Sequence, residues 1–280
     1  MPAQLYAGNL PARPARPRDA RELQIVALGS LLAFNLATLD YGAHLLPSLV
    51  AIAASLATQL ACSRLQRIAP DLRSPLITGL SLSLLLRGDG LWVMAAGAAA
   101  AIGSKFLLRI RGRHVWNPAT FGIVAMLLTG HAWVSPGQWG ASALLVALFG
   151  LLAMSVLARA GQLSTASLFL AAYAGLLLRR AHRLGDPLTI PAHQLESGAL
   201  LLFAFFMITD PKTTPRSLPA RAVFVAAVAA LAHYLAFTCQ CRSALYWSLF
   251  AAAPLVPLID WLTSRTPSPK PTPALHGATS

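Results

Sequence analysis

The sequence predicts an all-α integral membrane protein with about ten transmembrane helices, arranged as two inverted five-helix repeats. The first observation is composition: 56% of the 280 residues are hydrophobic and 11% are charged, whereas soluble domains carry about 25% charged residues. The second is that the apolar residues fall in separate runs with short polar connections between them. The third is that the order of these runs recurs after about 120 residues.

The apolar runs define the domain organisation. A membrane domain at 23–262 lies between a basic, Pro-rich tail at 1–22 and a Pro/Ser/Thr-rich tail at 263–280, and we expect both tails to be disordered. The first run resembles a retained span, so we expect no cleaved signal peptide. The ten runs lie at 23–39, 44–62, 75–86, 91–108, 118–130, 140–158, 163–178, 196–209, 222–238 and 243–262.

The basic residues between the runs predict the orientation. If the runs cross the membrane alternately, 17 of the 22 Lys and Arg residues lie on the side that carries both tails. By the positive-inside rule this side is cytoplasmic, and we expect the protein in a bacterial inner membrane. The same distribution explains the formal net charge of +13 without a nucleic-acid partner, so the expected surroundings are a lipid bilayer.

Two of the runs are too short for ordinary spans. Pro75–Leu86 and Ser197–Ile208 each hold about a dozen residues, or roughly 18 Å of helix against a hydrocarbon core of about 30 Å. They occupy corresponding places in the repeats at about 23–130 and 140–262, so we predict short, broken third and eighth helices. Such pairs of short segments point to a binding site near the midplane. The alternative for Ser197–Ile208 is a slightly short span followed by a solvated loop.

Three blocks of sequence, taken in chain order, resemble one protein family. They are SPLITGLSLSLLL (Ser74–Leu86), GSKFLLRIRGRHVWNPATFGI (Gly103–Ile123) and FFMITDPKTTP (Phe205–Pro215). These blocks are similar to the RnfD/NqrB family, the membrane subunits D of Rnf-type electron transport complexes and B of Na+-translocating NADH:quinone reductase. The resemblance implies a ten-helix fold related to urea-transporter-like channels, a flavin (FMN or riboflavin), and other Rnf/Nqr-type membrane subunits as partners.

The resemblance also bears on how a flavin would be attached. Family members with covalent FMN carry it on the last Thr of a motif such as Asp-Gly-x-Ser/Thr-Gly-Ala-Thr. The nearest match here is Gly140–Leu144, which lacks the acid and has Ser142 where Thr is expected. We therefore expect no covalent FMN at Ser142; the alternative is a helix start built of small residues.

Two candidate site residues belong to the second block. Asn117 precedes Pro118 as a helix N-cap would, and a helix start at membrane depth would offer N–H groups to a polar or anionic ligand. The alternative is a plain cap at the cytoplasmic face. Lys105 could reach a flavin carbonyl or phosphate, or its ammonium group could extend to the membrane interface.

The other candidates lie in the short segments. Asp210 follows a helix C-terminus, where the helix dipole disfavours an acid. That placement suggests a cation contact, a proton relay, or a pair with Lys212 or Arg113; the alternative is a solvated acid. Thr78 and Ser197 offer hydroxyl groups to a ligand, although in membrane helices such residues commonly serve close packing.

These features favour a multi-pass subunit of an RnfD/NqrB-like electron transport complex, in which flavin-linked electron transfer is coupled to ion transport. Any enzymatic activity would then belong to the complex. The alternative, motivated by the incomplete FMN motif, is a stand-alone channel or transporter for a small polar solute on the same scaffold. We expect no metal site, and the roles of Cys239 and Cys241 stay open.

Overall fold

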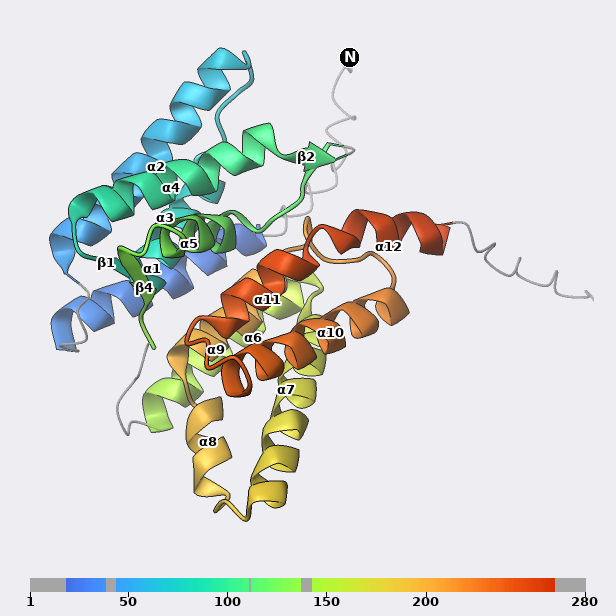
Figure 1. Ribbon diagram of the computed structural model, residues 1–280. Helices are drawn as coiled ribbons and strands as arrows, with labels where there is room; N and C mark the ends of the chain where they lie inside the picture. Colours follow the sequence, from blue (N-terminus) through green and yellow to red (C-terminus); the bar gives the residue numbers. More distant parts are fainter. Residues whose placement is uncertain (1–18, 39–43, 111, 137–142, 265–280) are drawn as a thin grey trace, which may run out of the picture.

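The computed structural model describes residues 19–38, 44–110, 112–136 and 143–264, and these are mainly helical (Figure 1). The first part of the chain contains α1 (Ala20–Thr38), α2 (Leu45–Leu65), α3 (Arg73–Leu85), β1 (Leu86–Gly88), α4 (Leu91–Leu107), β2 (Arg109–Ile110), β3 (Arg113–His114), α5 (Pro118–Leu127) and β4 (Ala132–Val134). The second contains α6 (Ala143–Ala160), α7 (Leu163–Leu184), α8 (Thr189–Leu195), α9 (Gly198–Leu202), the π-helix η1 (Phe203–Met207), α10 (Leu218–Phe237), α11 (Ala244–Ala252) and α12 (Leu255–Ser264).

Each of the ten predicted runs contains at least one helix. Three differences stand out: α1 already begins at Ala20 within the predicted tail, α8 lies between two predicted runs, and the tenth run is divided into α11 and α12. The last two helices are bent by 45° relative to each other, with Pro254 between them. Proline breaks a helix there because it has no N–H to donate and its ring clashes with the preceding turn.

Length and composition identify fewer spans than predicted. Among the described residues, α2 and α10 are long and apolar enough to cross a membrane, and up to four spans result if each of two bent helix pairs counts as one. Several other apolar helices, including α4 and α5, are shorter than the roughly 20 residues of a typical span. The structure is therefore that of a mostly helical membrane protein, while a count of ten spans goes beyond it.

The predicted short third and eighth segments take different forms. The third, α3, is a short but continuous helix of 13 residues that leads directly into β1, so it has no internal break. The eighth is formed by α9, which continues into η1. The bend of 49° lies before it, where α8 meets this helix. The backbone N–H of Ile208 bonds the carbonyl of Phe203 at 3.1 Å, the wider spacing of a π-helix. Such irregularities often mark functional places.

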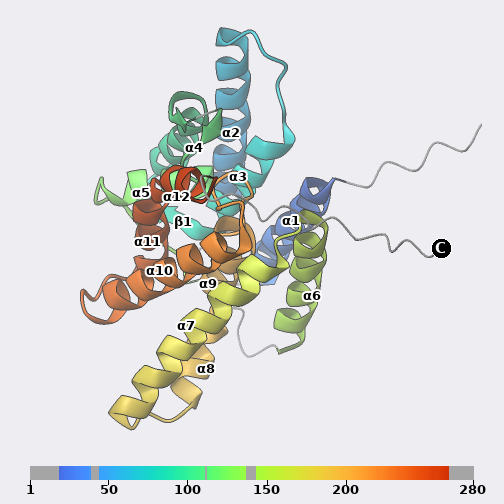
Figure 2. The same ribbon diagram turned by 90° about the vertical axis from the view of Figure 1, so that its right-hand side faces the viewer.

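The two parts of the chain pack in corresponding ways. In the first, α4 packs between α2 and α5; in the second, α10 packs between α7 and α11. Contacts of α1 with α6 and of α5 with α11 join the two parts. Figures 1 and 2 show the first part in blue to green on one side of the molecule and most of the second in yellow to red on the other.

A short extended segment links the two unusual helices. β4 pairs antiparallel with β1, and the N–H of Ser135 donates to the carbonyl of Leu85 at 2.8 Å. The carbonyl of Pro136 then accepts bonds from the Ala199 N–H and the Ser197 hydroxyl, both at 3.1 Å. The C-terminus of α3 is thereby tied to the N-terminus of α9.

Candidate functional site

A cavity of about 410 Å³ lies where the two parts of the chain meet. One wall comes from α3 as far as Ser81 and from the start of α5, and the other from α6, η1 and the segment after η1. The start of α1 also lines the cavity. Three of the predicted site residues, Thr78, Asn117 and Asp210, line it. Much of the remaining wall is apolar and includes Ile77, Ala119, Val156, Leu157, Phe205, Phe206 and Met207.

Asn117 is held in the cavity wall by its role as a helix cap. The hairpin of β2 and β3 turns through Gly112, whose φ of 77° suits glycine, and leads the chain to the start of α5. The Asn117 side-chain oxygen accepts a bond from the Thr120 N–H at 3.1 Å, which confirms the predicted N-cap. Its amide nitrogen then donates to Asp210 Oδ2 at 3.3 Å.

Asp210 joins the two walls of the cavity. Its Oδ1 accepts from the backbone N–H of Lys212 at 3.0 Å, and its Oδ2 lies 3.3 Å from His114 Nε2. Burial alone would raise the pKa of this carboxyl, but the hydrogen bond and charge of His114, together with the N–H and charge of Lys212, outweigh burial and lower the pKa. Asp210 is therefore a carboxylate at neutral pH.

The predicted partners of Asp210 are partly corrected. Arg113 does not pair with Asp210, because its guanidinium is 3.1 Å from Asp260 Oδ2 and also donates to the carbonyl of Pro211. Lys212 contributes through its backbone N–H and its charge. The Asp210 side chain is 18% exposed and has three polar neighbours, which favours a paired acid over a solvated one.

Lys105 lies behind the cavity wall and does not extend to the interface. Its side chain is buried, and Nζ donates to Gln59 Oε1 at 2.7 Å and to Ser74 Oγ at 3.1 Å. Gln59 in turn donates to Ser63 at 3.2 Å. Because Ser74 lines the cavity and Lys105 does not, the lysine can act on a ligand only through this serine or through its charge.

Two hydroxyl groups of α3 that line the cavity donate their hydrogen bonds to backbone carbonyls of the same helix. Thr78 Oγ1 donates to the carbonyl of Ser74 at 3.1 Å, and Ser81 Oγ donates to that of Ile77 at 2.9 Å. Their oxygens retain free lone pairs. This part of the wall therefore offers acceptors, and the Asn117 amide offers a donor.

The structure does not bring Ser197 into the cavity. It caps α9 at the end remote from Asp210 and donates to the Pro136 carbonyl. The reason is direction: α3 reaches the cavity with its residues as far as Ser81, whereas η1 reaches it with its C-terminal end. Residues near the starts of the two segments, Thr78 and Ser197, therefore lie at opposite ends. Ser142 lies outside the described residues.

His114 was missed by sequence analysis, although it contacts Asp210 and lines the cavity. The sequence could have indicated His114 as a site residue, because it lies only three residues before the predicted cap Asn117. The rim residue Arg21 was missed too. It bonds Asp71 at 2.6 Å and thereby ties the start of α1 to the connection before α3. Both contacts join residues far apart in sequence, which no local pattern reveals.

The apolar helices and the shared cavity define a class, a multi-pass helical membrane protein with a polar site between its two parts. More specifically, the chain belongs to the NQR2, RnfD, RnfE family, whose family model matches residues 127–268. The matched range contains the block with Asp210 and begins after the blocks with Thr78 and Asn117. A search of curated proteins found no match.

Proposed function

We propose that this protein is a membrane subunit of an RnfD/NqrB-like electron transport complex, and that it binds a flavin without a covalent bond in the cavity at Thr78, Asn117 and Asp210. Membership of the family supports the general role. The observation that carries the flavin proposal is a cavity of about 410 Å³ with apolar walls and a few converging polar groups, as is usual for cofactor sites. Electron transfer through this site would be coupled to ion movement by the assembled complex.

The residues present fit an isoalloxazine ring system. Its flat, largely apolar body suits the walls formed by Ile77, Phe206 and Met207. Its polar edge needs both donors and acceptors, which the Asn117 amide and the Thr78 hydroxyl oxygen supply. A bound flavin would supply one- and two-electron redox chemistry. The chain would contribute binding, orientation and exclusion of water.

Asp210 would be the residue through which a positive ion or a proton couples to the site. It is the acid in the cavity that connects η1 in the second part of the chain with α5 in the first. Its charge is held by neutral Asn117 and by His114, and both contacts to Oδ2 are long at 3.3 Å. A cation at Oδ2 would therefore meet a carboxylate with room to rearrange.

We further propose ten spans in two inverted repeats, with both termini in the cytoplasm of a bacterium and the chain in its inner membrane. The matching neighbours of α4 and α10, the contacts α1–α6 and α5–α11, and the opposed directions of α3 and η1 support it. A reporter fused after Ser264 should be active only in the cytoplasm, and one fused after Pro136 only outside. Both reporters on one side would refute this topology.

The flavin proposal is tested with the absorption spectrum of the purified protein before and after denaturation. We expect flavin that leaves the chain on denaturation. Asp210→Asn keeps the shape and removes the charge, so it should fold in wild-type yield and lose coupled ion transport. Asp89→Asn is the matched control, since Asp89 is exposed and contacts His131 outside the cavity. A wild-type protein without flavin, when purified with its complex, would refute the proposal.

A channel or transporter for a small polar solute is the second candidate. The observation that favours it is that the lone pairs of Thr78 and Ser81 and the Asn117 amide line one cavity, since these groups would also bind a solute such as an amide. This candidate predicts solute flux in flavin-free liposomes containing the chain alone. The electron-transport proposal predicts none.

A further inference from the structure

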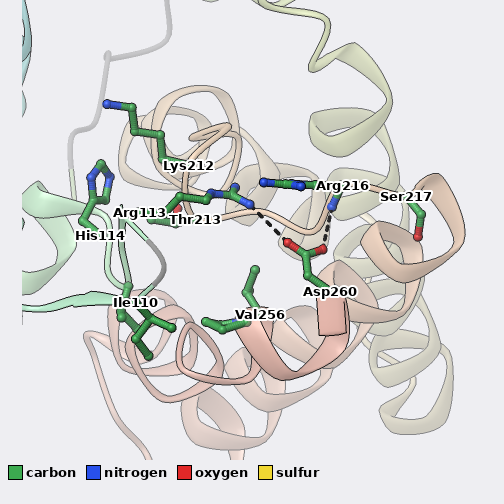
Figure 3. A pocket seen from close by; sticks show the side chains of 11 residues that line it. Ile110, Arg113, His114, Lys212, Thr213, Arg216, Ser217, Val256 and Asp260 are labelled. Atoms are coloured by element: carbon green, nitrogen blue, oxygen red, sulfur yellow. Dashed lines mark hydrogen bonds and ion pairs between the residues drawn. The ribbon is translucent and has the colours of Figure 1, made fainter. Parts of the chain in front are cut away.

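A second pocket of about 380 Å³ lies beside the flavin cavity (Figure 3). It is formed by the end of the β2–β3 hairpin, the segment from Lys212 to Ser217, and α12. His114 and Lys212 line both pockets. The proposed flavin site gives this second pocket no role.

The pocket carries an excess of positive charge. Three basic side chains, Arg113, Lys212 and Arg216, line one wall, opposite the apolar side chains of Ile110 and Val256 (Figure 3). Among the described residues that line the pocket, Asp260 is the one acid. Asp210, nearby in the flavin cavity, offsets part of the charge of Lys212, so a net positive charge is left.

Arg113 and Asp260 form the fixed part of the pocket. Arg113 Nη1 lies 3.1 Å from Asp260 Oδ2, and Arg113 Nη2 donates to the carbonyl of Pro211 at 2.6 Å. The other oxygen of Asp260 accepts from the backbone N–H of Arg216 at 3.0 Å. The carboxylate is thus occupied on both oxygens, and it holds the Lys212–Ser217 segment against α12.

Lys212 and Arg216 form the uncommitted part. Within the described residues, neither the Lys212 ammonium nor the Arg216 guanidinium has a hydrogen-bond partner, and both residues are exposed at the pocket mouth. The 20-residue helix α10 begins just beyond, with Ser217 as its N-cap. This positive dipole end lies on the Ser217 side of the pocket, and Lys212 lies on the opposite side (Figure 3).

We infer that this pocket binds the phosphate of a phosphate ester. Arginine and lysine donors on one wall suit the several oxygens of a phosphate. The volume exceeds what a bare phosphate needs, and the apolar wall of Ile110, Val256 and Pro257 leaves room for an organic part. The ester is either a soluble metabolite or an anionic lipid headgroup, since the chemistry that recognises the two is the same.

The experiment uses the full chain in neutral detergent and follows its melting temperature with glycerol 3-phosphate as the probe. Sodium chloride with glycerol at equal ionic strength is the reference. We expect glycerol 3-phosphate to raise the melting temperature of the wild type, and Arg216→Gln to weaken its apparent affinity about tenfold or more. Arg216 is the cleanest position because it lines this pocket and not the flavin cavity.

Arg64→Gln is the matched control, because Arg64 is exposed at the end of α2 and outside both pockets. Nanodiscs with and without phosphatidylglycerol separate the two sources. If phosphatidylglycerol stabilises the wild type but not Arg216→Gln, and weakens glycerol 3-phosphate binding, the source is a lipid. If only glycerol 3-phosphate acts, it is a soluble ester. No effect of either probe on the wild type, or an equal loss in Arg64→Gln, would overturn the inference.

Discussion

The crossing of α4 and α5 can be tested with a single methyl group at Gly122. A Cβ at this position would lie 2.8 Å from the Cβ of Ala101 and closer still to the backbone carbonyl oxygen of Gly97. A backbone atom inside a helix cannot move aside as the end of a side chain can. Gly122→Ala therefore has to push α5 away from α4. Gly103 lies in α4, and a Cβ built on it would have no atom within 4 Å beyond those of its chain neighbours and helix backbone, so Gly103→Ala is the control.

The magnitude follows from two opposed effects. Replacing a helical glycine with alanine stabilises by roughly 0.5–1 kcal/mol through backbone entropy, and this applies to both variants. Overpacking costs typically about 1–3 kcal/mol, and this applies to Gly122→Ala alone. The helix effect cancels in the comparison, so Gly122→Ala should be about 1–3 kcal/mol less stable than Gly103→Ala.

The assay is reversible unfolding in detergent micelles, with the wild type, Gly122→Ala and Gly103→Ala measured side by side. We expect Gly103→Ala at or above wild-type stability and Gly122→Ala below it. Because Asn117 caps α5, a displaced α5 should also disturb the Asn117–Asp210 contact and any bound flavin. Equal stabilities of the two variants would show that the helices do not cross at Gly122, and the reasoning would be refuted.

Three further predictions concern the cavity. The pKa of Asp210 is below its ordinary value, so the stability that the ionised carboxylate contributes is fully present above about pH 4 and is lost as the pH falls through the lowered pKa. Melting temperatures measured against pH should show this loss in the wild type and not in Asp210→Asn. The same pH profile in both proteins would contradict the prediction. Asn117→Ala removes an N-cap and should destabilise by about 1 kcal/mol, measured by unfolding against Asn117→Ser, which keeps a capping oxygen and adds no charge beside Asp210. A denaturing gel under ultraviolet light should show no flavin on the chain, and a fluorescent band that disappears in Ser142→Ala would restore covalent attachment.

The helices were largely predictable because membrane helices are apolar over most of their length. Helix α8 was not, since Thr189–Leu195 includes Pro191, His193 and Gln194 and does not form an apolar run. Pro254 indicates the bend after Ala252, but it lies within an apolar run, so 243–262 was predicted as one segment. The strands β1 and β4 are only three residues each and pair across about 45 positions. Strands this short have too few residues to show an alternating pattern in the sequence.

The site was predictable only where its geometry is local. Asn117 could be identified as a cap because the capping bond spans three residues. Its contact with Asp210 spans 93 residues and depends on how the two parts of the chain meet. Thr78 and Ser197 were both expected to offer hydroxyl groups to a ligand, because each lies near the start of a short segment. In the structure η1 reaches the cavity with its C-terminal end, so Ser197, which precedes α9, lies away from it.

The placement of Asp210 now has a physical explanation. At the end of η1 the helix dipole is unfavourable to an acid, yet Asp210 Oδ2 lies 3.3 Å from Asn117, the N-cap of α5, where the dipole is favourable. One part of the chain therefore supplies the acid, and the other supplies the Asn117 and His114 contacts. The His114 contact, together with the N–H and charge of Lys212, lowers the pKa of the acid. Separation of the two parts would remove the Asn117 and His114 contacts and raise the pKa of Asp210. Proton or cation affinity at this carboxylate would then depend on whether the cavity is closed, which is the property that coupled transport requires. The infrared carboxyl band of Asp210 would titrate at higher pH in Asn117→Ala than in the wild type; an unchanged titration would show that α5 does not hold the charge.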